Sequence, residues 1–402
     1  MSTTTTTTQN TELLPADLVG RANVVHLVNI IHPSDRQVYL RLSQRAGKLT
    51  ILASSPLGLH GIERSDWNDL DARLQRTVTL RRPQQHPLRF REMIDVHIPW
   101  DTISQLKTIQ PDIILSHETG FRSLLSAVYT LRNPHVPLVL WVAMTEHTEK
   151  GRGWPRYLLR RWLFRRADAV IVNGISTARY VSRFGVAANR MFSAPYVTLP
   201  EASFSGPATR VSAAAHHLLY VGQFVERKGL LPFLQVLARW ASANPARHVE
   251  FSLIGSGPLE VAIREFTLPP NVTLRLLGRR KPPEIAATYG TAGIFVLPTL
   301  ADEWGLVVNE AMASGLPVLG SLYSQAVEVL CENGKTGWTF RPDHADEMER
   351  ALYAALSTPP EVLDAMRAAA RQRVAHLTAD YVADQLVDAL GHVLKERQAS
   401  KA

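Results

Sequence analysis

The stretch "TLADEWGLVVNEAMASGLPVLGS", residues 299–321, places three acidic side chains around the start of an apolar helix. A short strand-like run leads directly into Asp302 and Glu303, and Gly305 then precedes a helix-like segment that contains Glu310. The first N–H groups of a helix and the positive end of its dipole favour a bound anion. Because Gly305 has no side chain to hold a ligand away from the backbone, we expect a phosphate to bind at this helix start.

The three acids suit neutral hydroxyl groups better than they suit a phosphate. A carboxylate would repel a phosphate beside it, so Asp302, Glu303 and Glu310 make better sense as acceptors of hydrogen bonds from hydroxyls. A sugar nucleotide, with phosphates in the middle and hydroxyl-rich groups at both ends, meets these requirements. An acidic helix N-terminus with a solvated Glu310 would show the same spacing, which leaves both interpretations open.

Strand-like and helix-like segments alternate on both sides of this stretch, which predicts parallel, doubly wound sheets. In the second half we expect strands at 218–221, 249–254, 273–277, 294–297 and 317–319, and helices at 230–243, 260–266, 283–289 and 306–313. In the first half we expect strands at 24–29, 49–53, 113–115, 138–142 and 169–172, with helices at 36–47 and 120–131.

We therefore expect an α/β protein with two Rossmann-like domains that face each other across a cleft. The expected divisions are a disordered tail (1–17), a first domain (18–199), a polar linker (200–215), a second domain (216–378) and a helix that packs back on the first domain (379–402). Ligands of open α/β sheets bind beyond the carboxyl ends of the strands, which should face this cleft.

A second phosphate site is expected in "LLYVGQFVERKGLLPFL", residues 218–234. A strand ends at Gly222, and Arg227 and Lys228 stand at the start of the next helix. Adjacent cations at a helix start are unfavourable unless an anion is bound there, and lysine is a usual phosphate-binding residue. A basic surface turn is the alternative. The glycine turn of "LIGSGPLE", residues 253–260, is a weaker sign of the same kind.

The motifs "GQFVERKG", "GSGPL" and "PTLADEWGLVVNEAMASGLPV" occur in this order, and "QAVEVLCENGKTGW" (325–338) follows them. The second half thereby resembles the retaining glycosyltransferases of the GT-B fold, the large family four of bacterial group 1 enzymes. The resemblance covers essentially the whole second domain and, more loosely, the first. It implies that the acceptor binds on the side of the first domain and the nucleotide sugar on the side of the second.

The resemblance also implies a role for each matching residue. Glu310 would hold the ribose hydroxyls, and Asp302 would contact hydroxyls of the donor sugar. Lys228 would stabilise the diphosphate, whose negative charge grows as the glycosidic bond breaks. The remaining donor-site residues would be Gly222, Gln223, Gly255, Gly257, Gly278, Arg279, Gly305, Leu306 and Val307; the amides of 305–307 would bind the distal phosphate, and the backbone at 278–279 would line the base pocket.

Two departures from the family pattern bear on these roles. The first acid is Asp302 where the family usually has glutamate, and Glu303 sits beside it, so either carboxylate could contact the sugar. The family's usual arginine after the first glycine is Gln223 here, and we expect Arg227 to supply the missing cation. A further difference is that "IIHPSDRQ" replaces the usual glycine-rich turn after the first strand.

The first domain offers fewer candidates. His117 and Glu118 follow directly after a strand, and the resemblance places a histidine at the matching position beside the reacting sugar. A structural histidine at a strand end is the alternative. Glu146 and His147, which follow the next strand, are candidates for the acceptor side.

A basic segment, "RGWPRYLLRRWLFRRADAV" (152–170), contains six arginines and no acid before Asp168. Its helical spacing brings the arginines of 156–166 together with Tyr157, Trp162 and Phe164. A basic helix with aromatic residues can lie on an anionic bilayer, which would suit a lipid-linked acceptor. A helix packed on the sheet with solvated arginines fits equally well.

Composition restricts the remaining possibilities. The 402 residues carry a net charge of +8 and one cysteine, Cys331, which excludes an intramolecular disulfide and a site of several cysteines and fits a reducing cytoplasm. The start of the sequence is unlike a secretory signal, and no apolar run is long enough to span a membrane. Asp69 and Asp71 form an Asp-x-Asp pair in a segment with a helical look, so we interpret them as surface acids and expect no metal requirement.

These observations predict a cytoplasmic retaining glycosyltransferase without a cofactor, which moves a hexose from a UDP- or GDP-sugar to a hydroxyl acceptor. The acceptor would be a saccharide or lipid-linked saccharide, and the enzyme would be cytoplasmic or peripheral at the inner face of the cell membrane. The expected reacting-site residues are His117, Lys228, Arg227, Asp302 and Glu303. The alternatives are a non-catalytic nucleotide-sugar-binding subunit and a sugar-nucleotide epimerase; no nucleic-acid motif accompanies the basic residues.

Overall fold

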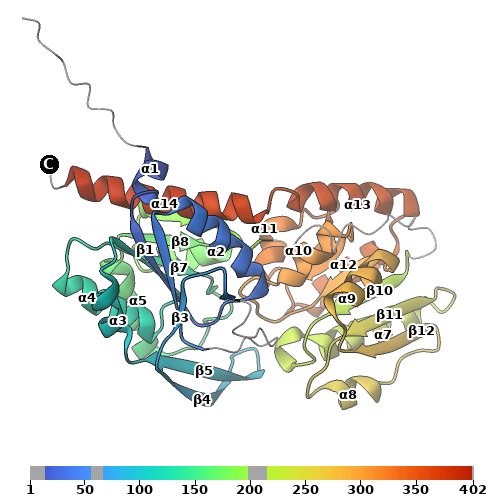
Figure 1. The fold of residues 1–402 in the computed structure, drawn as a ribbon. Coiled ribbons are helices and arrows are strands. Elements are labelled where there is room, and N and C mark those ends of the chain that lie inside the picture. Colours follow the sequence, from blue (N-terminus) through green and yellow to red (C-terminus); the bar gives the residue numbers. More distant parts are fainter. Residues whose placement is uncertain (1–13, 56–66, 198–214, 401–402) are drawn as a thin grey trace, which may run out of the picture.

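Two parallel sheets organise the chain, as the alternation of apolar runs and helices predicts (Figure 1). The computed structural model describes residues 14–55, 67–197 and 215–400. The predicted strands and helices of both halves are present, with ends that differ from the predicted ones by at most a few residues. The predicted fold class, two Rossmann-like α/β domains, is therefore confirmed.

The first sheet has seven strands in the order β3-β2-β1-β6-β7-β8-β9. Their bounds are β1 (Asn23–Val28), β2 (Lys48–Ala53), β3 (Ala72–Leu74), β6 (Ile113–His117), β7 (Leu138–Val142), β8 (Ala169–Val172) and β9 (Met191–Ser193). All neighbours pair in parallel. The central strands are apolar and buried along nearly their whole length, which requires helices on both faces of the sheet.

Helices cover both faces of this sheet. One face packs against α1 (Pro15–Val19), α2 (Pro33–Arg45) and α14 (Ala379–Ala399), and the other against α3 (Thr102–Ile109), α4 (Phe121–Arg132), α5 (Trp154–Arg166) and α6 (Ile175–Ser182). Side chains of β1 alternate between the two cores: Val24 contributes to the first and Val25 to the second. A short 3-10 helix, η2 (Ala188–Arg190), precedes β9.

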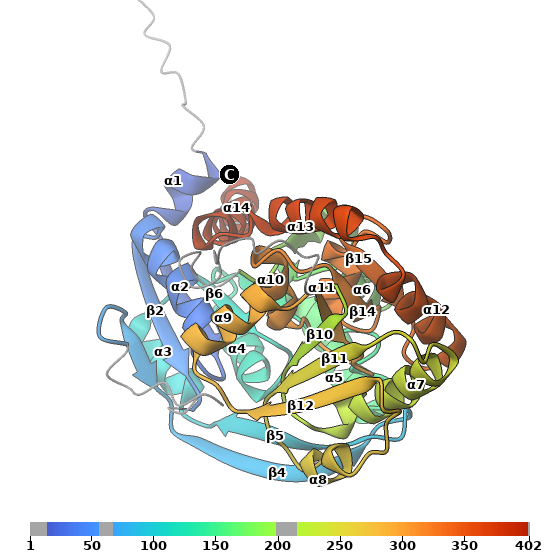
Figure 2. The ribbon, with the colours of Figure 1, turned by 90° about the vertical axis from the view of Figure 1, so that its right-hand side faces the viewer.

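A long antiparallel hairpin was not predicted. Strands β4 (Thr77–Gln85) and β5 (Arg91–Pro99) pair only with each other, and β5 packs on α4. The hairpin lies along the lower edge of the molecule in both views (Figures 1 and 2). Its turn reaches the second domain, where the backbone N–H of Arg91 donates to Glu226 Oε2 at 2.8 Å.

The second sheet has six strands in the order β12-β11-β10-β13-β14-β15. Their bounds are β10 (His217–Val221), β11 (Val249–Ile254), β12 (Val272–Gly278), β13 (Ile294–Leu297), β14 (Val318–Ser321) and β15 (Gly337–Phe340). Its helices are η5 (Glu226–Lys228), α7 (Leu230–Ala243), α8 (Glu260–Arg264), α9 (Pro282–Thr291), α10 (Leu306–Ala313), α11 (Gln325–Leu330), α12 (Ala345–Leu356) and α13 (Pro360–Val374).

The last helix, α14, packs against the N-terminal helices α1 and α2 of the first domain. Val382 and Leu386 of α14 belong to the core of the first domain, and Arg45 of α2 forms ion pairs of 2.8 Å with both Asp380 and Asp384. The predicted tail of residues 1–17 was drawn too long, because residues 15–17 belong to α1, which packs on α14. Residues 1–13 and most of the predicted linker at 200–215 lie outside the described residues.

Candidate functional site

Glycine turns follow three neighbouring strands of the second sheet. β10, β11 and β12 end side by side: Gly222 N donates to Ile254 O, and Gly255 N donates to Gly278 O, both at 2.9 Å. A Cβ on Gly255 would lie 1.8 Å from Gly222 O, so only glycine allows the two backbones to approach this closely. The predicted glycine turns therefore meet at one edge and present backbone rather than side chains.

Arg227 and Lys228 converge on a single carboxylate. Lys228 Nζ forms an ion pair with Asp302 Oδ2, and Arg227 Nη1 lies 3.3 Å from Asp302 Oδ1. Burial would raise the pKa of Asp302, but the two cations bring it below its ordinary value; burial lowers the pKa of Lys228, against the charge of Asp302. The anion that two adjacent cations require is thus a side chain of the protein itself.

Helix α10 begins where the sequence places it, directly after the acids. Gly305 caps it with φ of 105°, and a Cβ there would lie 2.8 Å from Ser324 Oγ. The first N–H groups of a helix, here those of Leu306 and Val307, have no partner within it. They follow Asp302 by four and five residues along the chain.

Glu310 lies on the same helix and is nearly buried. Its carboxylate accepts a hydrogen bond from the Tyr289 hydroxyl at 3.1 Å. Burial raises the pKa of Glu310 to about 7, and the bond from Tyr289 opposes that shift. Arg279, directly after β12, donates through Nε to Ser256 Oγ at 2.7 Å. Gln223 is exposed, whereas Arg227 contacts Asp302.

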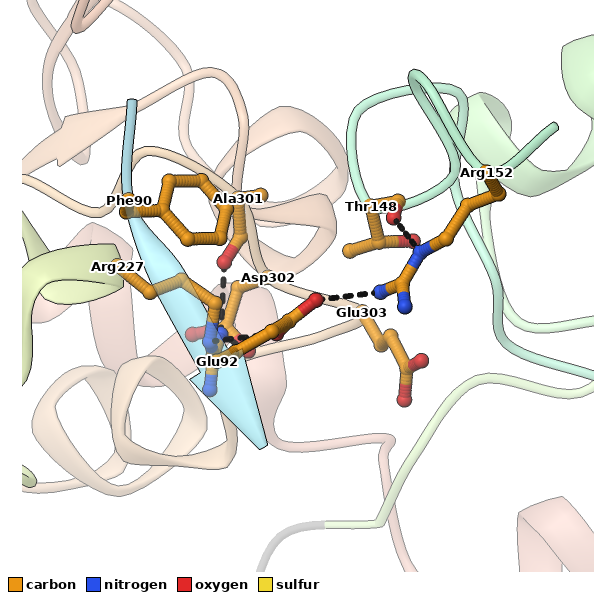
Figure 3. A pocket seen from close by; sticks show the side chains of 8 residues that line it. All are labelled: Phe90, Glu92, Thr148, Arg152, Arg227, Ala301, Asp302 and Glu303. Atoms are coloured by element: carbon orange, nitrogen blue, oxygen red, sulfur yellow. Dashed lines mark hydrogen bonds and ion pairs between the residues drawn. The ribbon is translucent and has the colours of Figure 1, made fainter. Parts of the chain in front are cut away.

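A cavity of about 170 Å³ lies between the two domains beside these cations (Figure 3). It is lined by Phe90, Glu92, Thr148, Arg152, Arg227, Ala301, Asp302 and Glu303. Arg152 Nη2 forms an ion pair with Glu92 Oε1 at 2.6 Å, and Arg227 Nε lies 3.9 Å from Glu92 Oε2. A chain of alternating charges therefore crosses the cavity from the first domain to Asp302.

Asp302 and Glu303 differ in their surroundings, although they are adjacent. Asp302 is held by both cations, whereas the Glu303 carboxylate has no hydrogen bond or ion pair with any described side chain. Figure 3 shows Glu303 pointing away from Arg227, below Arg152. Unlike Asp302, Glu303 is exposed, and it lines the cavity. Glu303 is thus the acid of this pair that is free to bind a ligand.

The corresponding edge of the first sheet is filled by side chains. His117 stacks on Trp141 with ring centroids 5.0 Å apart, and its Nε2 has no hydrogen-bond partner among the described residues. Burial lowers the pKa of His117 well below its ordinary value, so the ring is neutral near pH 7. The next residue, Glu118, has φ of 65°, accepts a hydrogen bond from Ala143 N at 3.0 Å, and has a pKa raised by burial.

Glu146 and His147 bridge the two domains. Glu146 Oε1 accepts from Arg179 Nη2 at 2.8 Å, and the same nitrogen donates to Glu328 of the second domain at 2.6 Å. His147 stacks on Tyr323 with ring centroids 3.9 Å apart. Both predicted acceptor-side candidates are therefore engaged in contacts of the protein with itself.

Asp69 and Asp71 do not line this cavity and lie just before β3, outside any α-helix, so the helical look of this segment was misleading. Asp69 pairs with Arg36 at 2.5 Å, and Asp71 accepts from Thr50 at 2.8 Å. Within residues 14–55, 67–197 and 215–400, no three histidine, cysteine or acidic side chains are grouped so as to hold a metal ion.

Sequence reasoning missed the contribution of the hairpin and of the loop after β7. Phe90 and Glu92 lie on the hairpin, and Thr148 and Arg152 lie on that loop. The alternating pattern of "TVTLRRPQQ" and "REMIDVHIP" is a hairpin signal that could have been found. The pairing of Glu92 with a cation of the other domain had no signal in the sequence.

Two family models match the chain, and together they cover well over half of it. The model described as "Glycosyl transferases group 1" matches residues 215–358, and the one described as "Glycosyltransferase Family 4" matches residues 36–195. The boundary between the two matches falls between the two sheets, so each model corresponds to one domain.

Proteins of known name and known structure are also similar to this chain. "Sulfoquinovosyl transferase SQD2" from Arabidopsis thaliana is 26% identical over 63% of this chain and 51% of its own length. "D-inositol 3-phosphate glycosyltransferase" from Pseudarthrobacter chlorophenolicus is 26% identical over 68% of this chain and 70% of its own length. The Anabaena protein HepE, solved in complex with UDP and glucose, has a TM-score of 0.64 and 14% identity, with 91% of this chain and 98% of that chain covered.

Proposed function

The chain belongs to the group 1 glycosyltransferases, and we propose that it transfers a hexose from a nucleoside diphosphate sugar to a hydroxyl acceptor. The observation that supports this proposal best is the convergence of Arg227 and Lys228 on one carboxylate, that of Asp302, three residues before the Gly305 cap of α10. Two cations and a helix start form a site for a diphosphate. A solved neighbour of the same fold holds UDP and glucose, which makes UDP-glucose the first donor to test.

The diphosphate of the donor would take the place of Asp302 between the cations. As the bond from C1 of the sugar to the phosphate oxygen breaks, negative charge gathers on the diphosphate, and Lys228 and Arg227 stabilise it. The acceptor oxygen bonds to C1 on the same face of the sugar, and its proton passes to the leaving phosphate. The resemblance to retaining enzymes is the ground for this stereochemistry. Because protein cations balance the diphosphate, we propose that transfer needs no metal ion and no cofactor.

Glu303 would contact the hydroxyls of the donor sugar. Asp302 is one methylene shorter than the glutamate usual in the family and is engaged by two cations, whereas Glu303 faces the open cavity. The ribose hydroxyls would bind Glu310, and the base would lie along the backbone at Gly278 and Arg279. This arrangement runs across the glycine turns of the second domain, which leave room for a ligand.

The acceptor would enter from the side of the first domain. The walls there are Phe90, Glu92, Thr148 and Arg152, an aromatic ring with polar groups around it, which suits a saccharide. We propose a saccharide or lipid-linked saccharide of polysaccharide synthesis, made on the cytoplasmic side of the membrane. His117 would remain neutral beside the reacting sugar and act through hydrogen bonding rather than as a cation.

A donor panel tests this proposal. UDP-, GDP- and ADP-sugars are added to the full chain with and without magnesium, and thermal unfolding is followed. A donor at about 100 times its Kd adds about 2.7 kcal/mol to the free energy of unfolding. We expect one nucleotide series to stabilise the chain, equally with and without magnesium. Release of free sugar and transfer to oligosaccharides are then measured, and the anomeric form of the product is read by NMR.

The outcomes separate the alternatives. Binding without any turnover across a panel of acceptors favours a non-catalytic subunit, and an altered nucleotide sugar without an acceptor indicates an epimerase. Absence of binding by every nucleotide sugar, with or without magnesium, would contradict the proposal. Loss of activity on addition of a chelator would contradict its metal-free form.

A further inference from the structure

The outward face of helix α5 is not used by the proposed reaction. The exposed fractions of its large side chains are 73% for Trp154, 50% for Leu158 and 38% for Trp162. Arg161 and Arg165 are also exposed. Positions 154, 158, 161, 162 and 165 follow helical periodicity, so these side chains share one face. Two tryptophans and a leucine exposed on one face of a single helix exceed the scattered apolar residues of an ordinary surface.

The other arginines of this helix have partners inside the protein, so only some of the arginines of 156–166 remain available for the membrane contact that the sequence suggests. Arg160 is 2% exposed and donates to Glu149 Oε2 and to the Tyr180 hydroxyl, both at 2.5 Å. Arg156 Nε lies 3.7 Å from Glu149, and Arg166 donates to Thr130 O at 3.0 Å. Phe164, which we had also placed on the basic face, is buried in the core.

Arg161 and Arg165, by contrast, make no hydrogen bond or ion pair with any residue that the structure describes. Helices α3, α4 and α5, which lie on the same side of the sheet, contain no acidic residue. Leu131 and Arg132 at the end of α4 are exposed and adjoin α5, because Arg166 bonds to the neighbouring Thr130. The outward face therefore combines unpaired cations with apolar side chains and has no anion of its own.

We propose that this face docks on an anionic lipid bilayer. Tryptophan side chains favour the headgroup level of a membrane, and a helix with apolar and basic residues on one side lies in the plane of the interface. Trp154, Leu158 and Trp162 would enter the boundary between headgroups and acyl chains. Arg161 and Arg165 would bind lipid phosphates. No described helix is long and apolar enough to cross a membrane, so the contact would be peripheral.

The position of this face also matters for the acceptor, a point that rests on the proposed function. Trp154 begins α5 only two residues after Arg152, which lines the cavity between the domains. A bilayer that holds Trp154 would therefore lie close to the acceptor side of that cavity. A saccharide linked to a lipid of the same bilayer could then reach the cavity without leaving the membrane.

Vesicle flotation tests the proposal without donor or acceptor. The full chain is mixed with vesicles of phosphatidylcholine alone or with 30% phosphatidylglycerol in the mixture (about a third anionic lipid, enough for a surface potential). We expect flotation with the anionic vesicles and little with the neutral ones. An arginine near an anionic surface contributes roughly a fivefold factor to binding. R161Q/R165Q should therefore weaken binding at least tenfold. W154S/W162S should also weaken binding, although it leaves the net charge of the chain unchanged.

The control removes two exposed arginines from the second domain, R239Q/R350Q, on α7 and α12. It has the same net charge as R161Q/R165Q, and its flotation should equal that of the unaltered chain. Circular dichroism and donor-induced thermal shift establish that each variant is folded, and they test the proposed function separately. Equal flotation of R161Q/R165Q and the control would overturn the proposal. So would a dimer in solution that R161Q/R165Q dissociates, because the face would then bind a second copy of the chain.

Discussion

The two sides of the cleft are built from the same kind of sheet but end in different ways. In the second domain the strands end in glycine turns, where Gly255 and Gly222 bring two backbones together without a side chain between them. In the first domain the strands end in side chains: His117 stacks on Trp141, and Glu118 holds the amide of Ala143. The edge of the second sheet presents backbone and cations to a ligand, whereas the edge of the first sheet is filled by the protein's own side chains.

This difference is the basis for proposing that the nucleotide binds to the second domain and the acceptor beside the first. The glycine-turn backbone, together with Arg227 and Lys228, suits a diphosphate. All nucleoside diphosphate sugars share this group. Side chains of the hairpin and of the loop after β7 suit a saccharide, which varies from one enzyme to another. The charge chain from Arg152 through Glu92 to Arg227 joins the two sides.

The largest expected effect is that of Lys228→Met. Loss of the cation beside the diphosphate should lower kcat on the order of 10²–10³-fold, because the charge that Lys228 stabilises develops in the transition state. Steady-state kinetics with saturating donor measure the change. Lys335→Met, at an exposed lysine paired with Glu332 at 2.8 Å, is the control and should leave kcat unchanged. An unaltered kcat in Lys228→Met would show that this side of the cleft is not the diphosphate site.

Glu303→Gln should lower kcat/KM for the donor by roughly 10- to 100-fold, the worth of a hydrogen bond to a charged acceptor. Asp302→Asn should mainly loosen Lys228 and Arg227, so its effect on thermal stability should exceed that of Glu303→Gln. The two substitutions are compared by kinetics and by thermal unfolding on the same preparations. If Asp302→Asn alone impairs the use of donor, the sugar contact belongs to Asp302, as the resemblance implies.

Glu310→Gln should weaken donor binding about tenfold above pH 7 and much less below it. Because burial raises the pKa of Glu310 to about 7, the wild-type carboxyl is protonated below that pH and accepts from the ribose only as a weaker, uncharged acceptor. Folded Glu310 binds its proton more tightly than unfolded Glu310, so its burial lowers stability as pH rises from 4.5 to about 7. The Gln variant should lack both pH dependences, which calorimetric titration and thermal unfolding at pH 5.5 and 8.5 would detect.

The smallest expected effect concerns the link between the two sides. Glu92→Gln removes a negative charge near Arg227, so the donor should bind roughly two- to fivefold more tightly, in the range of partly exposed ion pairs. Asp95→Asn removes an equal charge from the same hairpin, where Asp95 pairs with Arg81 at 2.7 Å, and should leave the donor Kd unchanged. Weaker donor binding by Glu92→Gln would indicate that the Glu92 carboxylate strengthens donor binding, for example by positioning Arg227.

Much of the fold was predictable because the signals were local. Parallel strands buried on both faces appear as continuous apolar runs, and residues 138–142, 249–254 and 294–297 were predicted with the observed bounds. The start of α10 was predictable because Gly305 interrupts the chain between two acids and an apolar segment of helical length. The hairpin was missed although its strands alternate, and the boundary near residue 17 was wrong because α1 depends on packing against α14.

The sequence by itself determined the central strands of the two sheets, the glycine turns, the cations at 227–228 and the acids of 302–310, since each depends on residues close together in the chain. Tertiary structure alone decided how these groups are used. Lys228 and Asp302 are 74 residues apart, yet their pairing makes Glu303 the free acid. Burial decided which arginines of α5 remain free, because Glu149 neutralises Arg160 and none of the described residues neutralises Arg161. Whether a charged side chain is paired or exposed depends on its neighbours in space, and these are brought together only when distant segments of the chain pack.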